Sequence, residues 1–455
     1  MNNKYSYISA PPGAGKSYWA ADRMMAQPAR YLVVRDRKEA IAEYKAKLEV
    51  QRNQRGLHIH IDAITSDAEQ PVRSTVANYP CWHDDEHIIL LITHAAMMMS
   101  DLSEYAGWHI IIDETPAVFD QQVLTAPASN EHFARLYNIT SLSEDWHAII
   151  ANETGVKLSP AEIGRDTMLA PFRQFHERVL EATAGGRAVV CDLADWADAK
   201  DGRQWTWWSA WSLTALEPFV SVTFMANAFA QSLTYAAFRA LHPSIEWQLV
   251  DIAPRPYKRR TVVIEYFAQG HTASRYLFDH PKGKQRLNKI ARHLADRSDQ
   301  IWTCNERFLP SLEKTAGQWL KPIQAGSNAF MFVDRAAMIY SAKPSTQIQG
   351  ILDSIGIEPA VWTETNEHEV ILQFICRTSV RDPDSDRPVH FTVYDEAQAS
   401  YLASFFRAQP HCDIKMVLTD LGFAETKPNL GGRPRVERTP DKIAADKAKR
   451  AKAAR

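Results

Sequence analysis

A strand, a tight turn and a helix follow one another within the first residues of the chain, and this turn constrains the fold most. The segment Tyr5–Ile8 is short, aromatic and β-branched, which is typical of a buried strand, and Ser17–Met25 has a helical pattern. Between them, APPGAGK (residues 10–16) holds two prolines and two glycines, which break both helix and strand. Such a loop points backbone N–H groups and a helix N-terminus at one place, so the sequence predicts an anion cradle.

The residues of this loop follow the phosphate-loop pattern G-x-x-x-x-G-K-[ST], with Ala10 in place of the first glycine. The pattern predicts that the Lys16 ammonium reaches the β- and γ-phosphates of a nucleotide and that the Ser17 hydroxyl ligates Mg²⁺. An ordinary turn with a surface lysine is the alternative. The predicted nucleotide-binding residues are Pro12, Gly13, Ala14, Gly15, Lys16 and Ser17. Because kinases, GTPases, motors and helicases all use such a cradle, it does not by itself name a function.

A second motif places two acids directly after an apolar run, in HIIIDETP (residues 109–116). At the carboxyl edge of a sheet, Asp113 can hold Mg²⁺ through water, and Glu114 can orient and deprotonate an attacking water. A strand that ends in solvated acids is the alternative. Together with the phosphate loop upstream, the pair predicts a magnesium-dependent ATPase.

Apolar runs separated by helical patterns predict an α/β fold with parallel sheets covered on both faces. A first group of expected strands precedes Pro254 and comprises 5–8, 31–34, 88–93, 108–113 and 219–225. A second group follows the linker Pro254–Arg260 and comprises 261–267, 300–304, 329–333 and 389–393. We therefore expect an N-terminal domain over 1–253 with a helical or irregular insertion at about 117–212, a second domain over 254–410, and an extension over 411–455 that ends in a basic tail.

Bulk properties exclude several classes of protein. The 455 residues are too many for one core, and the net charge of -2 shows no global nucleic-acid signature. Five scattered cysteines without a C-x-x-C pair favour a reducing cytoplasm over a disulfide framework. Cys81, His83 and His87 match no standard zinc spacing. No apolar run is long enough to span a membrane, and the polar N-terminus is unlike a signal peptide.

The order of APPGAGKS, YLVVRDRKEA, LLITHAAM and IIIDETP resembles the first motor domain of superfamily 2 DEAD/DEAH-like helicases. The resemblance implies two tandem RecA-like domains that bind ATP and Mg²⁺ between them. It also implies nucleic-acid backbone contacts by Arg35, Arg37, Thr93 and His94. The family's acidic box is usually D-E-x-[HD]. Here Pro116 takes the last position, which in the family couples the nucleotide to the other domain.

A segment of the second domain, ILQFICRTSVRD (residues 371–382), resembles the family's arginine-finger motif Q-x-x-G-R-x-x-R. Gln373 and Arg377 stand at the family spacing, Cys376 replaces the glycine, and Arg381 falls one residue late. The resemblance implies that Gln373 binds the nucleotide and that Arg377 and Arg381 neutralise charge on the γ-phosphate in the transition state. Surface ion pairs are the alternative for both arginines. Looser matches to family loops are Met225–Asn227 and Gly326–Asn328.

Two further stretches bear on nucleic acid. The tail from about Lys427 is basic and poor in large apolar residues, and its Gly432–Arg435 stretch resembles minor-groove-binding arms, with Arg433 and Arg435 as the contacts. A soluble basic tail is the alternative. The tryptophan cluster Trp205, Trp207, Trp208 and Trp211 could pack against a sheet or stack on bases.

The leading interpretation is an ATP-dependent nucleic-acid translocase, a DNA helicase of a replication or mobile-element system of phage or plasmid type. Its expected partners are single-stranded or forked DNA and a replication protein, with no membrane. Two alternatives are a terminase-like packaging or remodelling ATPase and a DNA-binding regulator switched by nucleotide. Glu114 argues against the switch, because a pure switch needs no water-activating base.

Overall fold

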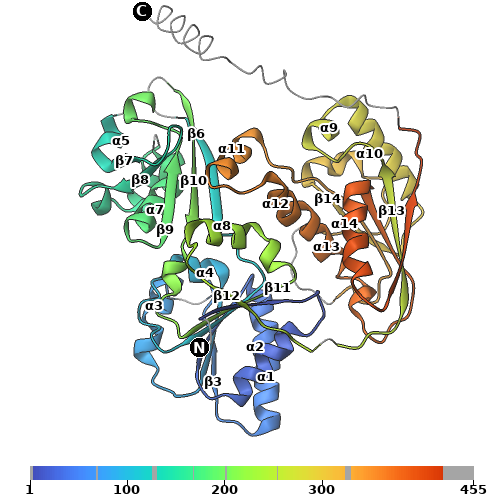
Figure 1. Ribbon diagram of the computed structural model, residues 1–455, viewed down its shortest axis with the longest axis horizontal. Helices are drawn as coiled ribbons and strands as arrows, with labels where there is room; N and C mark the ends of the chain where they lie inside the picture. Colours follow the sequence, from blue (N-terminus) through green and yellow to red (C-terminus); the bar gives the residue numbers. More distant parts are fainter. Residues whose placement is uncertain are drawn as a thin grey trace, which may run out of the picture.

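The protein is described from a computed structural model that covers residues 4–67, 70–125, 131–167, 169–199, 202–253, 255–322 and 329–423. Three sheets organise these residues, two of them parallel and one antiparallel. The two parallel sheets lie in separate lobes, and the antiparallel sheet forms a third lobe (Figure 1).

The first sheet has seven parallel strands in the order β12-β1-β11-β5-β2-β4-β3. Successive residues of its inner strands enter different apolar clusters: Leu32 belongs to one cluster and Val33 to the other. Both faces are therefore covered, as predicted for a doubly wound parallel sheet. Its strands are β1 (Tyr5–Ser9), β2 (Arg30–Arg35), β3 (His60–Ala63), β4 (Ile88–Thr93), β5 (His109–Asp113), β11 (Ser221–Ala226) and β12 (Trp247–Leu249). Its helices are α1 (Lys16–Ala26), α2 (Lys38–Arg55), α3 (Val72–Trp82), α4 (His94–Met99) and α8 (Leu233–Leu241).

The second sheet has six parallel strands in the order β15-β14-β16-β17-β13-β18. Its strands are β13 (Arg260–Ala268), β14 (Gln300–Cys304), β15 (Gln318–Trp319), β16 (Arg335–Ile339), β17 (Val389–Asp395) and β18 (Cys412–Leu418). The helices α9 (Arg275–Asp279), α10 (Pro281–His293), α13 (Glu369–Ile375) and α14 (Glu396–Arg407) accompany it. The two parallel sheets, each with its helices, form two tandem RecA-like domains.

Two expectations for the second domain were wrong. The strand expected at 329–333 is instead β16, six residues later, and the Phe332 side chain is 70% exposed. The sequence offers two apolar runs there, 329–333 and 336–340, and pairing with β14 and β17 selects the later one. The domain also continues past residue 410, because β18 pairs with β13 along its whole length.

The region between β5 and β11, expected to be helical or irregular, is built on an antiparallel sheet in the order β6-β10-β9-β8-β7. Its strands are β6 (Phe119–Thr125), β7 (Tyr137–Ser141), β8 (His147–Ala151), β9 (Arg187–Cys191) and β10 (Gln204–Trp211). The helices α5 (Glu131–Leu136), α6 (Pro160–Arg165) and α7 (Arg173–Thr183) pack around it. The edge strands β6 and β7 are largely polar, so they lack the continuous apolar run that marks the parallel strands.

The four tryptophans of β10 lie in the core. Trp205 and Trp207 pack on Phe175, and Trp208 stacks on Phe119 with ring centroids 5.2 Å apart. None of the four is more than 2% exposed. In this conformation they pack the insertion sheet and offer no surface on which bases could stack.

The helices α11 (Thr346–Ser354) and α12 (Pro359–Thr363) lie between the antiparallel sheet and the rest of the second domain (Figure 1). Ile348 and Leu352 of α11 belong to a core cluster of the first domain, and Ile351 packs with Trp208 of the insertion. One short helical unit thus contacts all three lobes. Within the described ranges, no helix is both long and apolar enough to cross a membrane.

Candidate nucleotide site between the parallel sheets

The loop between β1 and α1 adopts the geometry of a phosphate cradle. Gly13 and Gly15 have φ angles of 89° and 97°, which glycine adopts without the strain that a side chain would add. Gly15 caps α1 without a side-chain hydrogen bond, so the helix N-terminus is open to an anion. The buried Lys16 Nζ donates to the carbonyl oxygens of Ala10 at 2.7 Å and Pro11 at 3.2 Å, which keeps the ammonium at the loop.

The two acids follow β5, which is separated from β1 by β11 alone. The Ser17 hydroxyl donates to Asp113 Oδ2 at 3.4 Å, and Arg35 Nη2 lies 2.7 Å from the same oxygen. A hydroxyl and a carboxylate oxygen this close are suitable ligands for Mg²⁺. The structure thus brings together the two residues predicted from sequence to hold the metal.

Glu114 has the one positive φ among the non-glycine residues that the structure describes, 66°. Its backbone N–H donates to the carbonyl of Met225 at 2.9 Å, which holds the chain in this strained conformation. Burial raises the pKa of Glu114 to about 7; Lys16 opposes this increase, whereas Asp113 and Glu369 add to it. A carboxyl with a pKa near neutrality suits a general base.

One helical segment of the second domain faces these acids. It comprises α12, the π-turn η7 (Glu364–His368) and α13, and residues at four-residue spacing along it contact the first domain. Thr365 Oγ1 accepts from Leu233 N at 2.8 Å, Glu369 Oε2 accepts from Asn227 Nδ2 at 2.9 Å, and Gln373 Nε2 donates to Glu114 Oε2 at 3.4 Å. Because four residues make about one helical turn, these side chains share one face.

Arg377 lies four residues after Gln373, and the environment of its guanidinium is unusual for a charged group. Its side chain lies over the Phe374 ring at 5.3 Å, it is only 4% exposed, and its Nη1 is buried without a hydrogen-bond partner. Burial, together with the nearby charges of Arg37 and Arg381, lowers the pKa of Arg377 to about 10. A buried guanidinium with an unsatisfied donor beside two other guanidiniums fits an anionic ligand.

The other predicted finger, Arg381, lies against the phosphate loop. A Cβ added to Gly13 would lie 3.7 Å from Arg381 Cβ and 2.7 Å from the hydroxyl of Tyr257, a residue of the interdomain linker. Any side chain at position 13 would therefore collide with the linker tyrosine. The second domain and the linker meet the first domain at the cradle itself.

A cavity of about 240 Å³ adjoins the loop on this side. Its walls include Pro11 of the loop, Ile252 of the linker region and Phe405 of α14. Tyr257 and His411 also line it, stacked with ring centroids 4.7 Å apart and 11° between their planes. An apolar and aromatic space beside a phosphate cradle has the character of a site for a nucleotide base.

The residues expected to contact nucleic acid lie close to the nucleotide site. Arg35 pairs with Asp113 and stacks over Tyr44, with its guanidinium carbon 4.6 Å from the ring centroid. His94 Nε2 is 2.9 Å from the backbone oxygen of Asp113, and burial lowers the pKa of this histidine to about 4. Thr93 Oγ1 caps α4 by accepting from Ala96 N at 3.1 Å.

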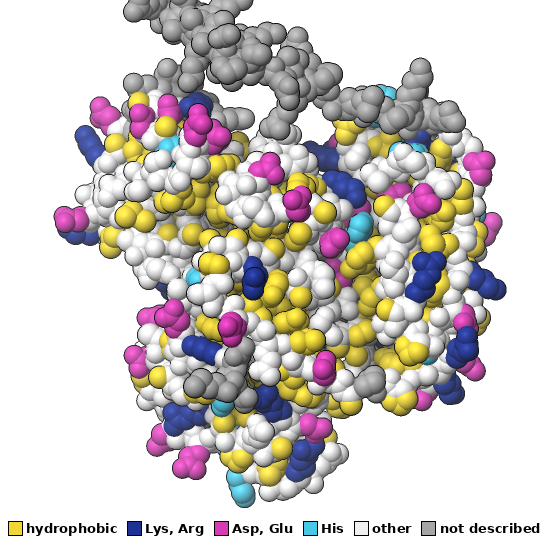
Figure 2. All heavy atoms as spheres, viewed as in Figure 1, with side chains coloured by type: hydrophobic (Ala, Val, Ile, Leu, Met, Phe, Trp, Pro, Cys, Tyr) yellow, Lys and Arg dark blue, Asp and Glu magenta, His cyan; other side chains and the backbone are white. Residues whose placement is uncertain are grey.

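In this arrangement Arg35, Thr93 and His94 have structural partners within the first domain, and Arg37 lies beside Arg377. Their contacts with nucleic acid stay a prediction. On the face shown in Figure 2, basic and acidic side chains are interspersed instead of gathered into one basic area. Arg433 and Arg435, and the loop Gly326–Asn328, lie outside the described residues.

The sequence reasoning missed Thr365, Glu369 and Tyr257. Thr365 and Glu369 precede Gln373 and Arg377 at four-residue steps, a signal that becomes readable only once the segment is known to be helical. Tyr257 was placed in a linker, and no local signal shows that its ring returns to the phosphate loop.

The comparisons with known proteins support the fold. No protein-family model matches the chain, and no curated protein matches its sequence. A solved structure described as "XPD_APO" matches with a TM-score of 0.50 and 10% identity over 91% of this chain and 98% of that one. Further similarities include "XPD_Helicase" (TM-score 0.49, 10% identity, 91% and 96% covered) and "Structure of S. tokodaii Xpd4" (0.47, 10%, 90% and 96%). The arrangement of two RecA-like domains is thus the fold found in superfamily 2 helicases.

Proposed function

We propose that the protein hydrolyses ATP with Mg²⁺ and uses closure of its two RecA-like domains to move along nucleic acid. The observation that carries the proposal is Arg377, a buried arginine of the second domain whose Nη1 lacks a partner at the cleft that holds the phosphate loop. An arginine supplied across a closing cleft stabilises charge on the γ-phosphate, and it links hydrolysis to domain movement.

In this proposal the loop residues Pro12, Gly13, Ala14, Gly15 and Lys16 bind the phosphates. Ser17 and Asp113 would hold Mg²⁺, which would neutralise phosphate charge. Glu114 accepts a proton from the attacking water at its carboxylate, and Gln373 orients that carboxylate through its 3.4 Å hydrogen bond. Arg377 and Arg381 face the developing charge on the terminal phosphate, and the cavity beside Tyr257 and His411 accepts the base.

The nucleic-acid substrate is proposed on the motif resemblance and the fold. The finer proposal is a DNA helicase that acts on single-stranded or forked DNA in replication or in a mobile element, with a replication protein as a possible partner. The basic tail, with Arg433 and Arg435, would add phosphate contacts.

The test is the rate of ATP hydrolysis with and without a single-stranded oligothymidylate, with Lys16→Ala as the control for contaminating ATPases. We expect a basal rate that single-stranded DNA raises severalfold in the parent and not in the variant. Stimulation by duplex DNA alone would favour a packaging or remodelling motor. Nucleotide-dependent DNA binding without hydrolysis would identify a switch and overturn the proposal.

A further inference from the structure

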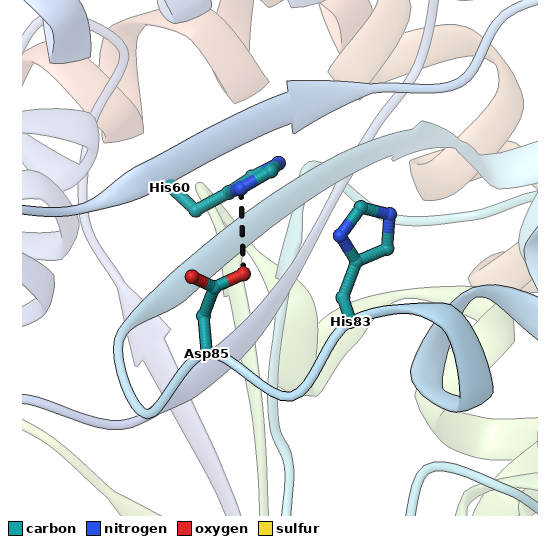
Figure 3. Close-up of side chains that lie close together, drawn as sticks. All are labelled: His60, His83 and Asp85. Carbon is teal, nitrogen blue, oxygen red and sulfur yellow. Dashed lines mark ion pairs between the residues drawn. The ribbon is translucent and has the colours of Figure 1, made fainter.

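A cluster of three metal-ligating side chains lies at the edge of the first sheet, apart from the nucleotide site. His60 begins the edge strand β3, and His83 and Asp85 lie in the segment that follows α3 (Figure 3). One potential ligand atom from each residue lies within 4.8 Å of the other two, and His60 Nδ1 is 3.4 Å from Asp85 Oδ2. All three lie at the amino ends of β3 and β4, whereas the phosphate loop and Asp113 lie at the carboxyl ends of their strands.

The three side chains converge because several contacts outside the cluster position them. The His83 ring stacks on Tyr79, with centroids 4.1 Å apart and 25° between the planes. His60 N donates to the carbonyl of His87 at 3.1 Å, which sets the register of β3 against the segment that carries Asp85. Arg30 Nε donates to the carbonyl of Asp85 at 3.0 Å and so fixes the backbone of that residue.

The spacing suits a small transition-metal ion. Zn²⁺ binds histidine nitrogen and carboxylate oxygen at about 2.0–2.2 Å, which in a tetrahedral site places ligand atoms about 3.3 Å apart. The His60–Asp85 pair already has this separation, at 3.4 Å. In Figure 3 a ring nitrogen of His83 faces the space beside that pair. The ligand atoms lie within 4.8 Å of one another, so a shift of up to about 1.5 Å would complete a three-ligand set.

Cys81 and His87, which lie near His83 in the sequence, take no part in the cluster. The Nε2 atom of His87 is 2.8 Å from the carbonyl oxygen of Met24, and Cys81 Sγ lies 3.9 Å from a carboxylate oxygen of Glu104. His60 is more than twenty residues away from His83 in the chain, so only the pairing of β3 with β4 brings it to the site.

We propose that His60, His83 and Asp85 bind one Zn²⁺ ion that ties the edge strand β3 to the segment after α3. The ion would take two imidazole nitrogens and one carboxylate oxygen, with solvent completing the coordination at this partly exposed position. β3 has four residues and, among the described strands, pairs with β4 alone, so a metal bridge at its first residue would stabilise the end of the sheet. This site is independent of the proposed ATPase function.

The test uses the full chain, freed of metal with EDTA and kept without nucleotide. Zn²⁺ bound per chain is measured by equilibrium dialysis, and Co²⁺ is used as a spectroscopic probe of nitrogen ligation. We expect one ion per chain, at least about tenfold weaker binding in His60→Ala and in His83→Ala, and unchanged binding in His58→Ala, an exposed histidine of the same segment. Zn²⁺ should also raise the Tm of the parent and of His58→Ala but not of the two cluster variants.

Asp85→Asn, which keeps the size of the side chain, repeats the test should a histidine variant fail to fold. Asp113→Asn separates this site from the nucleotide site, because it should keep its Zn²⁺. The proposal is overturned if the parent binds no Zn²⁺, if both cluster variants bind it as the parent does, or if Asp113→Asn alone loses it.

Discussion

The two parallel sheets contribute opposite chemistry to the same cleft. The first sheet supplies a cradle of backbone N–H groups, one lysine and the acids Asp113 and Glu114. The sequence of the second domain carries no phosphate loop. This domain supplies side chains at four-residue spacing, of which Gln373 and Arg377 are the last two. In the proposed function, the first domain therefore supplies the phosphate contacts, whereas the chemistry needs residues of both domains. Substitution of the phosphate-loop lysine should therefore lower both nucleotide affinity and turnover, whereas substitution of the second-sheet arginine should lower turnover alone.

The largest effect is expected on the first-sheet side. Lys16→Ala removes the ammonium that the loop carbonyls hold, and ATP hydrolysis should fall below detection while ATP affinity also drops. The measurements are steady-state turnover and the Kd of a fluorescent ATP analogue. Lys47→Ala, an exposed lysine of α2, is the matched control. Normal turnover in the Lys16 variant would remove the basis of the ATPase proposal.

Arg377→Ala tests the second-sheet side. Turnover should fall about a thousandfold, the lower range for an arginine finger, while ATP affinity stays within a few-fold of the parent. Single-turnover hydrolysis and the same Kd measurement separate the two quantities. Arg387→Ala, which removes an exposed arginine that pairs with Asp334, should leave both unchanged. A loss of affinity equal to the loss of rate would mean that Arg377 helps to hold the ground state, and the contrast between the sheets would disappear.

Glu114→Gln should lower turnover about a hundredfold with ATP binding retained, because the amide cannot accept the proton of the attacking water. Pre-steady-state measurement of the chemical step is the appropriate test. Glu43→Gln, an exposed position on α2, is the control. If the Glu114 variant turns over at the parent rate, another group is the base.

The pH dependence gives a smaller effect. Because the pKa of Glu114 is raised to about 7, its carboxylate is a minor species at pH 6 and the major species at pH 8. Turnover should thus rise about tenfold over this interval, and the Glu114→Gln variant should lose that rise. A rate that falls with pH across the same interval would show that a protonated group limits the reaction.

The smallest effect is expected at Glu369, which accepts from Asn227 of the first domain and Gln373 of its own helix. Glu369→Gln removes one of the charges that raise the pKa of Glu114, so the midpoint of the pH–rate profile should move to lower pH. Turnover at pH 8 should change only a few-fold. Glu364→Gln, one turn earlier in the π-turn, serves as the control. An unchanged midpoint would show that the charge of Glu369 does not contribute to the raised pKa of Glu114.

Much of the fold was predictable because its signals are local. A strand, a glycine-rich turn and a helix start are adjacent in the chain, so the geometry of the phosphate loop followed from residues 5–25. The inner parallel strands are largely apolar, and β4 and β14 begin and end at the predicted residues. The insertion was misjudged because the strands at its edges are mixed in polarity, and the pairing of β6 is decided by a partner up to about 90 residues away.

The sequence by itself predicted which residues would bind phosphate, ligate Mg²⁺ and accept a proton, because that prediction needs only side-chain chemistry and spacing along one strand or turn. Tertiary structure alone decided which of them meet. Gln373 reaches Glu114 across 259 positions, Tyr257 returns to Gly13, and His60 joins His83 through the pairing of β3 with β4. The pKa of Glu114 and the unsatisfied Nη1 of Arg377 likewise depend on burial and on charges from both domains. Such properties arise only when distant segments exclude water together, and no local pattern encodes that event.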